Sequence, residues 1–476
     1  MIRRLLSLLG GFAGESALLF VRNIVIARLL SIEDYGIAST FALTAMLVEM
    51  VSQLGLKQLI MQAAEGDDPA FQAGLHGFQA LRGLTNAAAV LVLAEPIAWF
   101  LGVPEIAWAY RVVALVPLLQ GFFHLDPERM QRQSRYRAAV LSPGIAAALS
   151  LVSLWPLHAL LGDWRIMLCA LLIQIGGQVL LSHLFAERPW RARLDGALMR
   201  RSLRFGWPLL LNGLLIYAAM NGEKLVAGRE LGLAALGILT MGVTLTLNPL
   251  LIGTRVVQSL MLPRLSRSEG PAFLRLAGVT CDGGAAVGMA LMAGTVLVGP
   301  PFVSLVLGAK FEPLIPLLTP LAAVQALRAL RIGPTFVAMS RARTTLPMLS
   351  NLPRVAAIGL AWIVLHRGGD MLDLVLLAVA GEVAGTAAAF ALMARIEGAP
   401  ARWLPIRGLL PVLLVAATLI ADHARWHGAG WGAPVGDGLP ERAATGALLL
   451  LALAMIAWVL VISRQLLRAA KAGGGA

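Results

Sequence analysis

The sequence contains little charge and little cysteine. Charged residues make up 14% of its 476 residues, against roughly 25% in an ordinary soluble domain, so a chain of soluble domains is excluded. The two cysteines, Cys169 and Cys281, lie in or beside apolar segments, and we expect neither a disulfide nor a metal site. The chain has no Gly-x-x-x-x-Gly-Lys-Ser/Thr loop, which excludes ATP as the direct energy source, and no cofactor is expected.

Long hydrophobic runs are abundant instead, and hydrophobic residues account for 58% of the chain. About 20 apolar residues span a bilayer, and a helix does so while satisfying its own backbone hydrogen bonds. The runs predict an all-α integral membrane protein with about fourteen transmembrane helices. The predicted spans cover residues 5–27, 36–56, 81–101, 106–124, 138–161, 166–185, 205–227, 235–262, 283–298, 314–338, 349–365, 372–393, 409–420 and 443–462.

Positive charge alternates between the loops. Of the 39 lysines and arginines, 24 lie in the termini and in loops of one parity, and seven lie in loops of the other. Cytoplasmic loops retain positive charge, so both termini are predicted to be cytoplasmic. Arg3 and Arg4 precede an apolar run as in a signal peptide, but the run is long and has no cleavage site, which predicts a retained first span. Because no basic tail or helix carries interleaved aromatics, the net charge of +13 does not indicate nucleic-acid binding.

A short pattern recurs 201 residues along the chain. Arg28-Leu29-Leu30 and Tyr35-Gly36-Ile37 correspond to Arg229-Glu230-Leu231 and Leu236-Gly237-Ile238. Chance similarity between apolar helices is the alternative to a true repeat, but both copies link the first two spans of a half. We therefore predict two six-helix lobes around a central cavity, related by an axis along the membrane normal. The N-lobe would cover residues 1–200, the C-lobe residues 201–400, and two additional spans with a cytoplasmic tail residues 401–476.

Five short motifs, in order along residues 5–400, resemble those of the polysaccharide-transport family in the MOP (multidrug/oligosaccharidyl-lipid/polysaccharide) flippase superfamily. The first is similar to the "ARLL-spacer-(D/E)-(Y/F)-G" signature near the start of these proteins, and the third to their "R-x-x-R-(F/Y)-R" cytoplasmic loop. The matching segments are residues 26–36, Arg82-Gly83-Leu84, residues 132–137, Phe205-Gly206-Trp207-Pro208 and residues 325–330.

The resemblance implies a Wzx-like oligosaccharide flippase in the bacterial inner (plasma) membrane. Such proteins move a polyprenyl-diphosphate-linked glycan to the periplasmic leaflet by alternating access, for the biosynthesis of O-antigen, capsule or exopolysaccharide. The expected partners are this lipid-linked glycan and the membrane lipids, with polysaccharide polymerase or glycosyltransferases as candidate protein partners. No catalytic residues are expected.

A polar cavity with fixed positive charge would suit the diphosphate of such a substrate. Arg22, Lys224 and Arg328 are placed mid-span on three helices from both halves of the chain, where an unpaired charge is costly. Carboxylates within spans are candidates for coupling transport to H⁺ or Na⁺. The substrate-binding candidates are Arg22, Lys224, Arg328, Arg255, Asn212 and Asn248, and the ion-coupling candidates are Glu15, Glu49, Glu223 and Glu382.

Each candidate also has a structural interpretation. Arg22, Lys224 and Arg331 could extend to an interface if the span boundaries differ by one turn. Arg255 could end its helix near the cytoplasm. Which helices are neighbours decides between these alternatives.

Other polar residues could also have purely structural roles. Arg354 sits near a span end, and arginines there are more often anchors than ligands. Glu15 and Glu49 could pair with a neighbouring arginine to fix helix packing, and Asn248 could hydrogen-bond between helices. Glu382 is expected to be an isolated carboxylate.

Two other function classes compete with the flippase. A cation-coupled multidrug exporter of the same superfamily would share the architecture, but it would be expected to carry acidic cavity residues for cationic drugs. A membrane glycosyltransferase or polysaccharide polymerase would need a catalytic carboxylate in a sizeable outer loop. The longest outer loop, about residues 421–442, contains Asp422, Asp437 and Glu441 without a recognisable constellation.

The charge distribution makes a topological prediction. Reporter fusions at the C-terminus and within residues 188–204 should report a cytoplasmic location, because these segments belong to the arginine-rich set. Periplasmic activity of a reporter fused to the C-terminus would contradict the fourteen-span topology.

Overall fold

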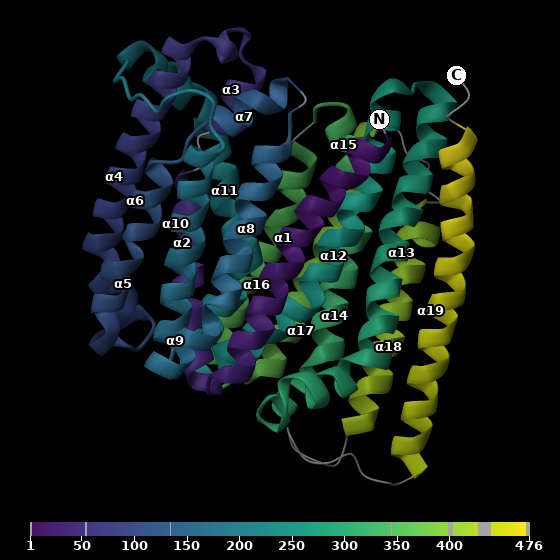
Figure 1. Cartoon of the computed structure of the whole chain (residues 1–476). Coiled ribbons are helices and arrows are strands. Elements are labelled where there is room, and N and C mark those ends of the chain that lie inside the picture. Colours follow the sequence, from purple (N-terminus) through teal and green to yellow (C-terminus); the bar gives the residue numbers. More distant parts are fainter. Residues whose placement is uncertain are drawn as a thin grey trace. The chain divides into compact units, whose positions relative to one another are not determined.

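The computed structural model describes residues 2–52, 55–133, 135–343, 345–397, 403–426 and 439–472, and every regular element within these ranges is a helix (Figure 1). The chain forms two compact units. Unit 1 comprises Met1–Asn221 and Gly232–Gly237, and unit 2 comprises Gly222–Leu231 and Ile238–Ala476.

Six helices of the first half have 16 residues or more, shorter helices lie between them, and the predicted spans at residues 106–124 and 138–161 are each divided between helices. The helices of this half are α1 (Ile2–Leu29), α2 (Ile32–Ser52), α3 (Leu56–Gln62), η1 (Ala64–Asp67), α4 (Pro69–Phe100), η2 (Pro104–Ile106), α5 (Ala107–Val113), α6 (Leu115–Gly121), α7 (Asp126–Arg132), α8 (Arg137–Val152), α9 (Leu154–Leu161), α10 (Arg165–Leu184) and α11 (Gly196–Glu230). Helix α11 begins in unit 1 and ends in unit 2.

The second half follows the same pattern. It contains α12 (Leu233–Arg267), α13 (Gly270–Phe302), η3 (Val303–Leu307), η4 (Ala309–Leu314), α14 (Ile315–Leu330), α15 (Ile332–Ser340), α16 (Thr345–His366), α17 (Met371–Glu397), η5 (Leu404–Leu409), α18 (Leu410–Trp426) and α19 (Leu439–Ala472).

Ten of the described helices or broken helices are long and apolar enough to cross a membrane, and a bent pair formed by Pro104–Gly121 and Asp126–Arg132 would make eleven. Helices α1, α2 and α11 carry more charge, but at 1.5 Å per residue each is long enough for a hydrocarbon core of about 30 Å. Each predicted hydrophobic run lies on a helix or broken helix, apart from residues 53–54, which fall outside the described ranges. The predicted all-α membrane fold is therefore confirmed.

Helices α4, α11 and α13 begin 9 to 13 residues before the predicted spans that they contain. The apolar runs predict starts at residues 81, 205 and 283, whereas α4 begins at Pro69, α11 at Gly196 and α13 at Gly270. Hydropathy reports the apolar part of a helix, while capping decides where the helix begins. At α4, the Asp68 carboxylate accepts a hydrogen bond from the Ala70 amide at 3.0 Å, and Pro69 occupies the first turn, so the helix extends beyond its apolar segment.

In unit 1, α4 packs against α5 and α6, and α8 packs against α1 and α10 (Figure 1). The contact between α4 and α6 requires a glycine. A Cβ atom added at Gly83 would lie 2.6 Å from the Cα atom of Gly121 and 2.8 Å from the carbonyl oxygen of Pro117. The glycine of the Arg82-Gly83 motif therefore allows two helix backbones to approach closely.

The two copies of the repeated pattern also meet at glycines. A Cβ atom at Gly237 would lie 2.6 Å from the Ile32 carbonyl oxygen, and one at Gly36 would overlap the Leu233 carbonyl group. All four residues belong to unit 1. The equivalent positions of the two copies thus form one close backbone crossing, which accounts for glycine at both.

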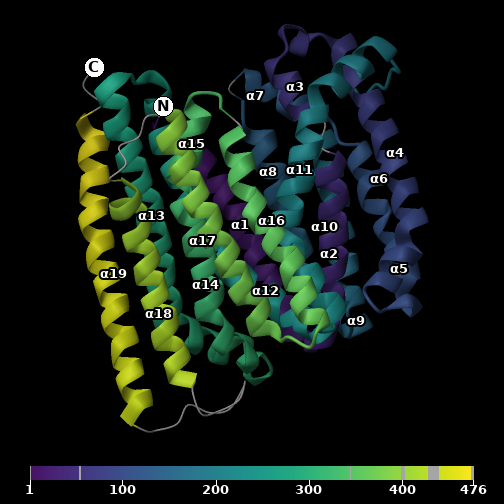
Figure 2. The ribbon, with the colours of Figure 1, turned by 180° about the vertical axis from the view of Figure 1, so that it is seen from behind.

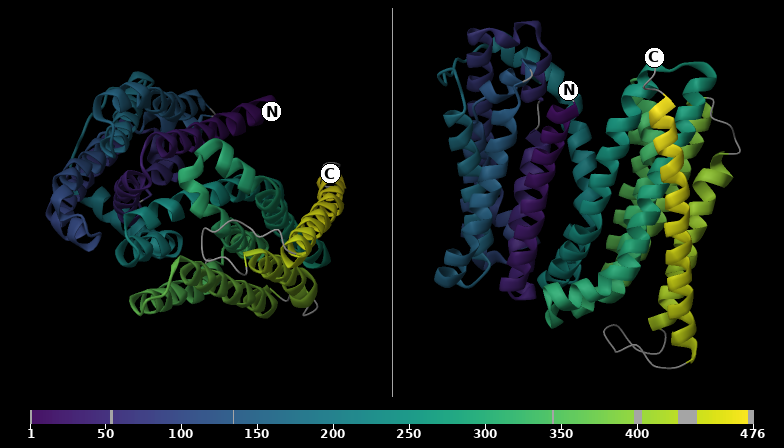
Figure 3. Two further views of the ribbon diagram at one scale, coloured as in Figure 1. Left: turned by 90° about the horizontal axis from the view of Figure 1, so that it is seen from below. Right: turned by 45° about the vertical axis from the view of Figure 1, so that its right-hand side comes forward.

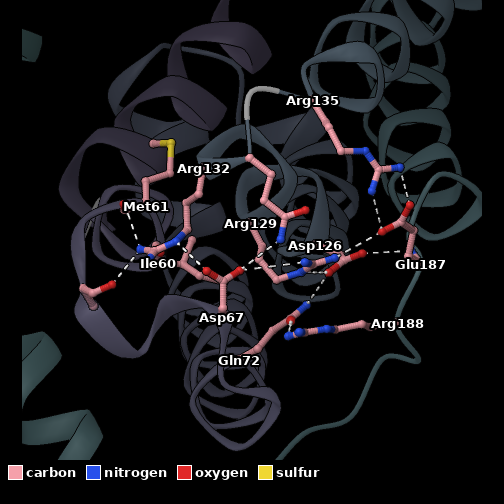
Figure 4. A network of polar contacts seen from close by, with 12 residues as sticks. Ile60, Met61, Asp67, Gln72, Asp126, Arg129, Arg132, Arg135, Glu187 and Arg188 are labelled. Atoms are coloured by element: carbon pink, nitrogen blue, oxygen red, sulfur yellow. Dashed lines mark hydrogen bonds and ion pairs between the residues drawn. The ribbon is translucent and has the colours of Figure 1, made fainter.

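One end of unit 1 carries a polar network, which we call the polar cap: Asp67, Gln72, Asp126, Arg129, Arg132, Arg135, Glu187 and Arg188 (Figure 4). At its centre, Arg129 Nε lies 2.5 Å from Asp126 Oδ1, and the two side chains are 5% and 0% exposed. Asp126 Oδ2 also accepts a hydrogen bond from the Glu187 amide at 2.8 Å. These contacts join α7 to the segment that follows α10.

The arginines of the motif at residues 132–137 have distinct roles in the polar cap. The Arg132 guanidinium donates hydrogen bonds to the carbonyl oxygens of Ile60, Met61 and Ala63 at 3.1, 3.0 and 2.6 Å, and so caps the end of α3 (Figure 4). Arg135 forms an ion pair with Glu187, and its hydrogen bond lowers the pKa of the Glu187 carboxyl group. The arginines of this loop therefore also stabilise the structure of the polar cap.

In unit 2, α16 and α17 lie side by side along their length, as Figure 2 shows. The C-terminal helix α19 packs along α13 and α18 (Figure 3). The core of this unit forms around α13 and α14, where Met289, Leu327 and Leu330 are fully buried. Helix α14 is the most enclosed element, because every residue from Leu317 to Leu330 is buried.

Candidate substrate site

The most enclosed helix of unit 2 carries charge. A helix that is buried on all sides is normally apolar all round, and α14 fits this pattern except at its C-terminal end. Gln325 and Arg328 lie there on one face, and Arg331 occupies the break between α14 and α15. The exposed fractions of Arg328 and Arg331 are only 8% and 9%. Such buried cations need counter-charges or hydrogen-bond acceptors close by.

Glu382 on α17 supplies the central counter-charge. Its Oε1 atom lies 2.5 Å from Arg328 Nε and 2.6 Å from Arg354 Nε, and its Oε2 atom lies 3.5 Å from Arg331 NH2. The carboxylate is 1% exposed. Three guanidinium groups from α14, α16 and the break after α14 therefore converge on one carboxylate.

Amide groups and a second carboxylate complete the cluster. Asn351 Oδ1 accepts hydrogen bonds from Arg331 at 3.1 Å and from Arg354 at 2.9 Å, and so bridges the two. Arg328 receives a further contact from Glu223 of α11, whose Oε1 atom lies 3.4 Å from NH2. We call Glu223, Arg328, Arg331, Arg354 and Glu382 the charge cluster.

The packing of α17 leaves room for these arginines. A Cβ atom at Gly385, three residues after Glu382, would lie 2.8 Å from the Ser350 carbonyl oxygen and 3.1 Å from Arg331 NH1. Any larger residue at this position would push against α16 or against the guanidinium. A small residue here is therefore part of the site.

The charges of the cluster do not balance. Its three guanidinium groups face two carboxylates, and half-buried Lys224 follows Glu223 on the same helix and interacts electrostatically with both Glu223 and Arg328. Among the five members of the charge cluster, the guanidinium groups outnumber the carboxylates by one. A low-dielectric region with excess positive charge is favourable for an anionic group that enters it.

The structure brings together several residues that the sequence suggested separately. Arg328, Glu223 and Glu382 meet in one cluster, and Arg328 NH1 also contacts Gln325 Oε1 at 3.3 Å. Two expectations were wrong. Glu382 is not isolated, and Arg354 is not an interfacial anchor but a buried partner of Glu382.

The reason for these errors is that hydropathy does not reveal which helices are neighbours. One signal for Arg354 was present: Asn351 lies three residues before it, so two polar side chains share one face of an apolar span. Arg331 is likewise directed into the bundle, where its NH1 donates to the Ser350 carbonyl oxygen at 3.1 Å, rather than extending to an interface.

Arg22 belongs to unit 1 and has its own partners. Its NH1 group hydrogen-bonds to Ser150 Oγ at 3.2 Å and to Gln174 Oε1, and its exposed fraction is 6%. The arginine of α1 is therefore buried against α8 and α10. Both partners are neutral, so neither of these two contacts neutralises the positive charge of Arg22.

The remaining candidates are more dispersed. Asn248 donates to the Thr244 carbonyl oxygen of its own helix at 2.8 Å, and Arg255 is exposed on α12. Glu49 is exposed and Glu15 half-buried. Asn212 lies on α11, but its side chain is outside the described residues. None of these forms part of the charge cluster.

Residues 25–316 match the family model described as "Polysaccharide biosynthesis protein". The chain belongs to this family. The matched region covers the last five residues of α1, all elements from α2 to η4, and the first two residues of α14.

Two curated members of related systems align with the chain. It is 22% identical to the lipopolysaccharide biosynthesis protein WzxC of Escherichia coli (strain K12) over 422 residues, which cover 84% of this chain and 83% of that protein. It is 28% identical to the succinoglycan biosynthesis transport protein ExoT of Rhizobium meliloti (strain 1021) over 234 residues, which cover 47% and 45% of the two chains.

Solved structures support the fold. The lipid II flippase MurJ in an inward closed conformation superposes with a TM-score of 0.68 at 13% identity, covering 96% of this chain and 98% of that one. A multidrug resistance MATE family transporter of the MOP superfamily superposes with a TM-score of 0.65 at 14% identity, covering 85% and 95%. At these identities the likeness shows that this member of the family has the MOP fold.

The charge cluster makes a stability prediction. Glu382→Gln should destabilise the protein by about 3–5 kcal/mol, because it leaves three buried guanidinium groups without their central counter-charge. Glu95→Gln removes an exposed carboxylate that pairs with Arg111, and it should cost at most about 1 kcal/mol. Thermal unfolding of the detergent-solubilised variants measures both. Equal melting temperatures for the two variants would show that the cluster does not stabilise unit 2.

Proposed function

We propose that this protein is a flippase that moves a polyprenyl-diphosphate-linked oligosaccharide from the cytoplasmic to the periplasmic leaflet, by alternating access, for surface polysaccharide biosynthesis. The observation that carries the proposal is the group of three buried guanidinium groups that converge on Glu382 in unit 2, in a chain that belongs to a polysaccharide biosynthesis family. The names of its matches support the same class, since they include a biosynthesis transport protein and a lipid II flippase.

The physical requirement for such a protein is clear. A sugar headgroup with a diphosphate cannot cross hydrocarbon alone, because each polar group that loses water without a new partner costs several kcal/mol. Cationic side chains with fixed positions within the membrane reduce this cost for the diphosphate. Arginine suits the role because its planar fork can bind two phosphate oxygens at once.

The alternatives fit less well. The multidrug transporters among the structural matches share the fold, but a cationic drug would be repelled by the three guanidinium groups around Glu382. An enzymatic role receives no support from the family or from the named relatives, which are biosynthesis, transport and flippase proteins.

The location follows from the same proposal. The chain is a multi-pass membrane protein, and we place it in the bacterial inner membrane with both termini in the cytoplasm. The 24-to-7 distribution of positive charge supports this orientation. The expected partners are the lipid-linked glycan and membrane lipids, and a polymerase or glycosyltransferases acting before or after the flip.

Mutations of Arg22, Lys224 and Arg328 test the proposed role of the cations. Alanine at any one should reduce surface polysaccharide in a complemented flippase-deficient strain at matched expression, because a contact to phosphate is lost. Lysine at Arg22 or Arg328 should restore only part of the polysaccharide. Arg111→Ala, which removes an exposed arginine, is the control and should leave the polysaccharide unchanged. Full polysaccharide from the triple alanine variant would exclude these charges as the substrate site.

Ion coupling is the second part of the proposal. Glu382 is poorly suited to take up and release a cation, because three arginines stabilise its negative charge. Glu223 is 13% exposed and its one described ion pair, with Arg328, is 3.4 Å long, so it is the better candidate of the two. Glu15 and Glu49 remain further candidates.

We therefore expect Glu223→Gln to remove the dependence of flipping on a proton or sodium gradient in proteoliposomes that contain a polyprenyl-diphosphate-linked sugar. Glu95→Gln is the comparison, since this exposed carboxylate pairs with Arg111 and is not an ion-coupling candidate. A Glu223→Gln variant that responds to the gradient like the wild type would exclude coupling through Glu223.

A further inference from the structure

Unit 1 contains a polar pocket whose lining includes no member of the charge cluster. Its volume is about 220 Å³, and it lies next to the polar cap, where α3, α4 and the end of α6 meet. Lys57 connects the pocket to α7, the helix that carries Asp126 and Arg129 of the polar cap, because its Nζ atom lies 3.3 Å from Glu128 Oε1. The lining residues are Glu49, Gly55, Leu56, Lys57, Gln58, Gln79, Arg82, Gln120 and Phe123.

The lining is unusually rich in amides. Gln58, Gln79 and Gln120 come from three different helices, and an amide side chain offers both donors and an acceptor. Gln79 is held in place, since its Nε2 group donates to the carbonyl oxygens of Gln120 at 3.2 Å and of Phe123 at 2.9 Å. Gln79 is therefore a fixed part of the polar wall, and beside it Lys57 Nζ lies over the ring of Phe123, 4.9 Å from the ring centroid.

The charges of this pocket balance, unlike those of the charge cluster. Lys57 pairs with Glu128, and Arg82 interacts electrostatically with Glu49, which also lines the pocket. A phosphate entering here would meet the carboxylate of Glu49 and two cations that already have counter-charges. The combination of amides, a paired carboxylate and an aromatic ring instead suits a neutral ligand with several hydroxyl groups and one apolar face.

We infer that this pocket binds one sugar ring of the glycan headgroup, with Glu49, Gln58 and Gln120 hydrogen-bonding to hydroxyl groups and Phe123 contacting the apolar face of the ring. The inference rests on the proposed flippase function and adds a specificity site to it. The volume fits this assignment, because 220 Å³ is below the range of about 300–1,000 Å³ typical of pockets for larger ligands. The pocket is therefore of a size for one sugar ring and too small for a whole repeat unit.

The test compares carriers with and without a sugar. The purified full-length protein is titrated with polyprenyl diphosphate and with polyprenyl diphosphate carrying glucose, galactose or N-acetylglucosamine. The wild type should bind at least one sugar-bearing carrier more tightly than the sugarless carrier. Gln58→Ala and Gln120→Ala should each weaken that binding by roughly threefold to tenfold, the value of one lost hydrogen bond, while affinity for the sugarless carrier stays the same.

Gln62→Ala is the matched control, because Gln62 is an exposed glutamine on α3 that does not line the pocket. It should change neither affinity. If the pocket variants weaken both carriers equally, the pocket binds phosphate and the inference fails. If they keep the full preference for the sugar-bearing carrier, the sugar binds elsewhere and the inference also fails.

The two proposals fail in different ways. Loss of sugar preference in the pocket variants together with normal flipping of the sugarless carrier supports the pocket assignment. Wild-type protein that flips no carrier in proteoliposomes, yet binds them with the expected preference, would contradict the flippase proposal and leave the pocket assignment intact.

Discussion

Buried guanidinium groups impose the strictest constraint on unit 2. Helix α14 is enclosed over its whole length, so Arg328 and the adjacent Arg331 cannot reach water and must find partners inside the bundle. Glu382 on α17 and Asn351 on α16 provide them, which fixes how these helices pack around α14. Even the small residue at Gly385 follows from this need, because the arginines occupy the space that a side chain would fill.

The charge cluster is expected to contribute less to the free energy of folding than to the choice of ligand. Paired charges in a low-dielectric region recover little more than the cost of removing them from water. A well-packed set of apolar residues could hold the same helices together at least as well. The three arginines around Glu382 are therefore not needed to hold the helices together, and they would suit the anionic ligand that we propose.

The sequence predicts the fold of this protein well and its site only in part. Apolar runs of about 20 residues locate the helices because burial in hydrocarbon is a property of each segment alone. They do not locate helix starts such as Pro69, which depend on the capping Asp68. They also cannot show that Arg354 and Glu382 meet, because that depends on the packing of α16 against α17. The pocket at Gln58, Gln79 and Gln120 had no signal in hydropathy, since single glutamines in three separate segments form no pattern.

The hydrogen bonds that Arg132 makes to the end of α3 have a consequence for recognition. Helix α3 has only seven residues, too few to be stable alone, and it carries Lys57 and Gln58 on one wall of the pocket. Its orientation is held by a guanidinium from α7, 69 to 72 residues away in the chain. The wall is thereby preorganised, and the entropy of ordering it is lost during folding rather than when the ligand binds. Affinity for a ligand is then partly determined at an arginine that does not line the pocket.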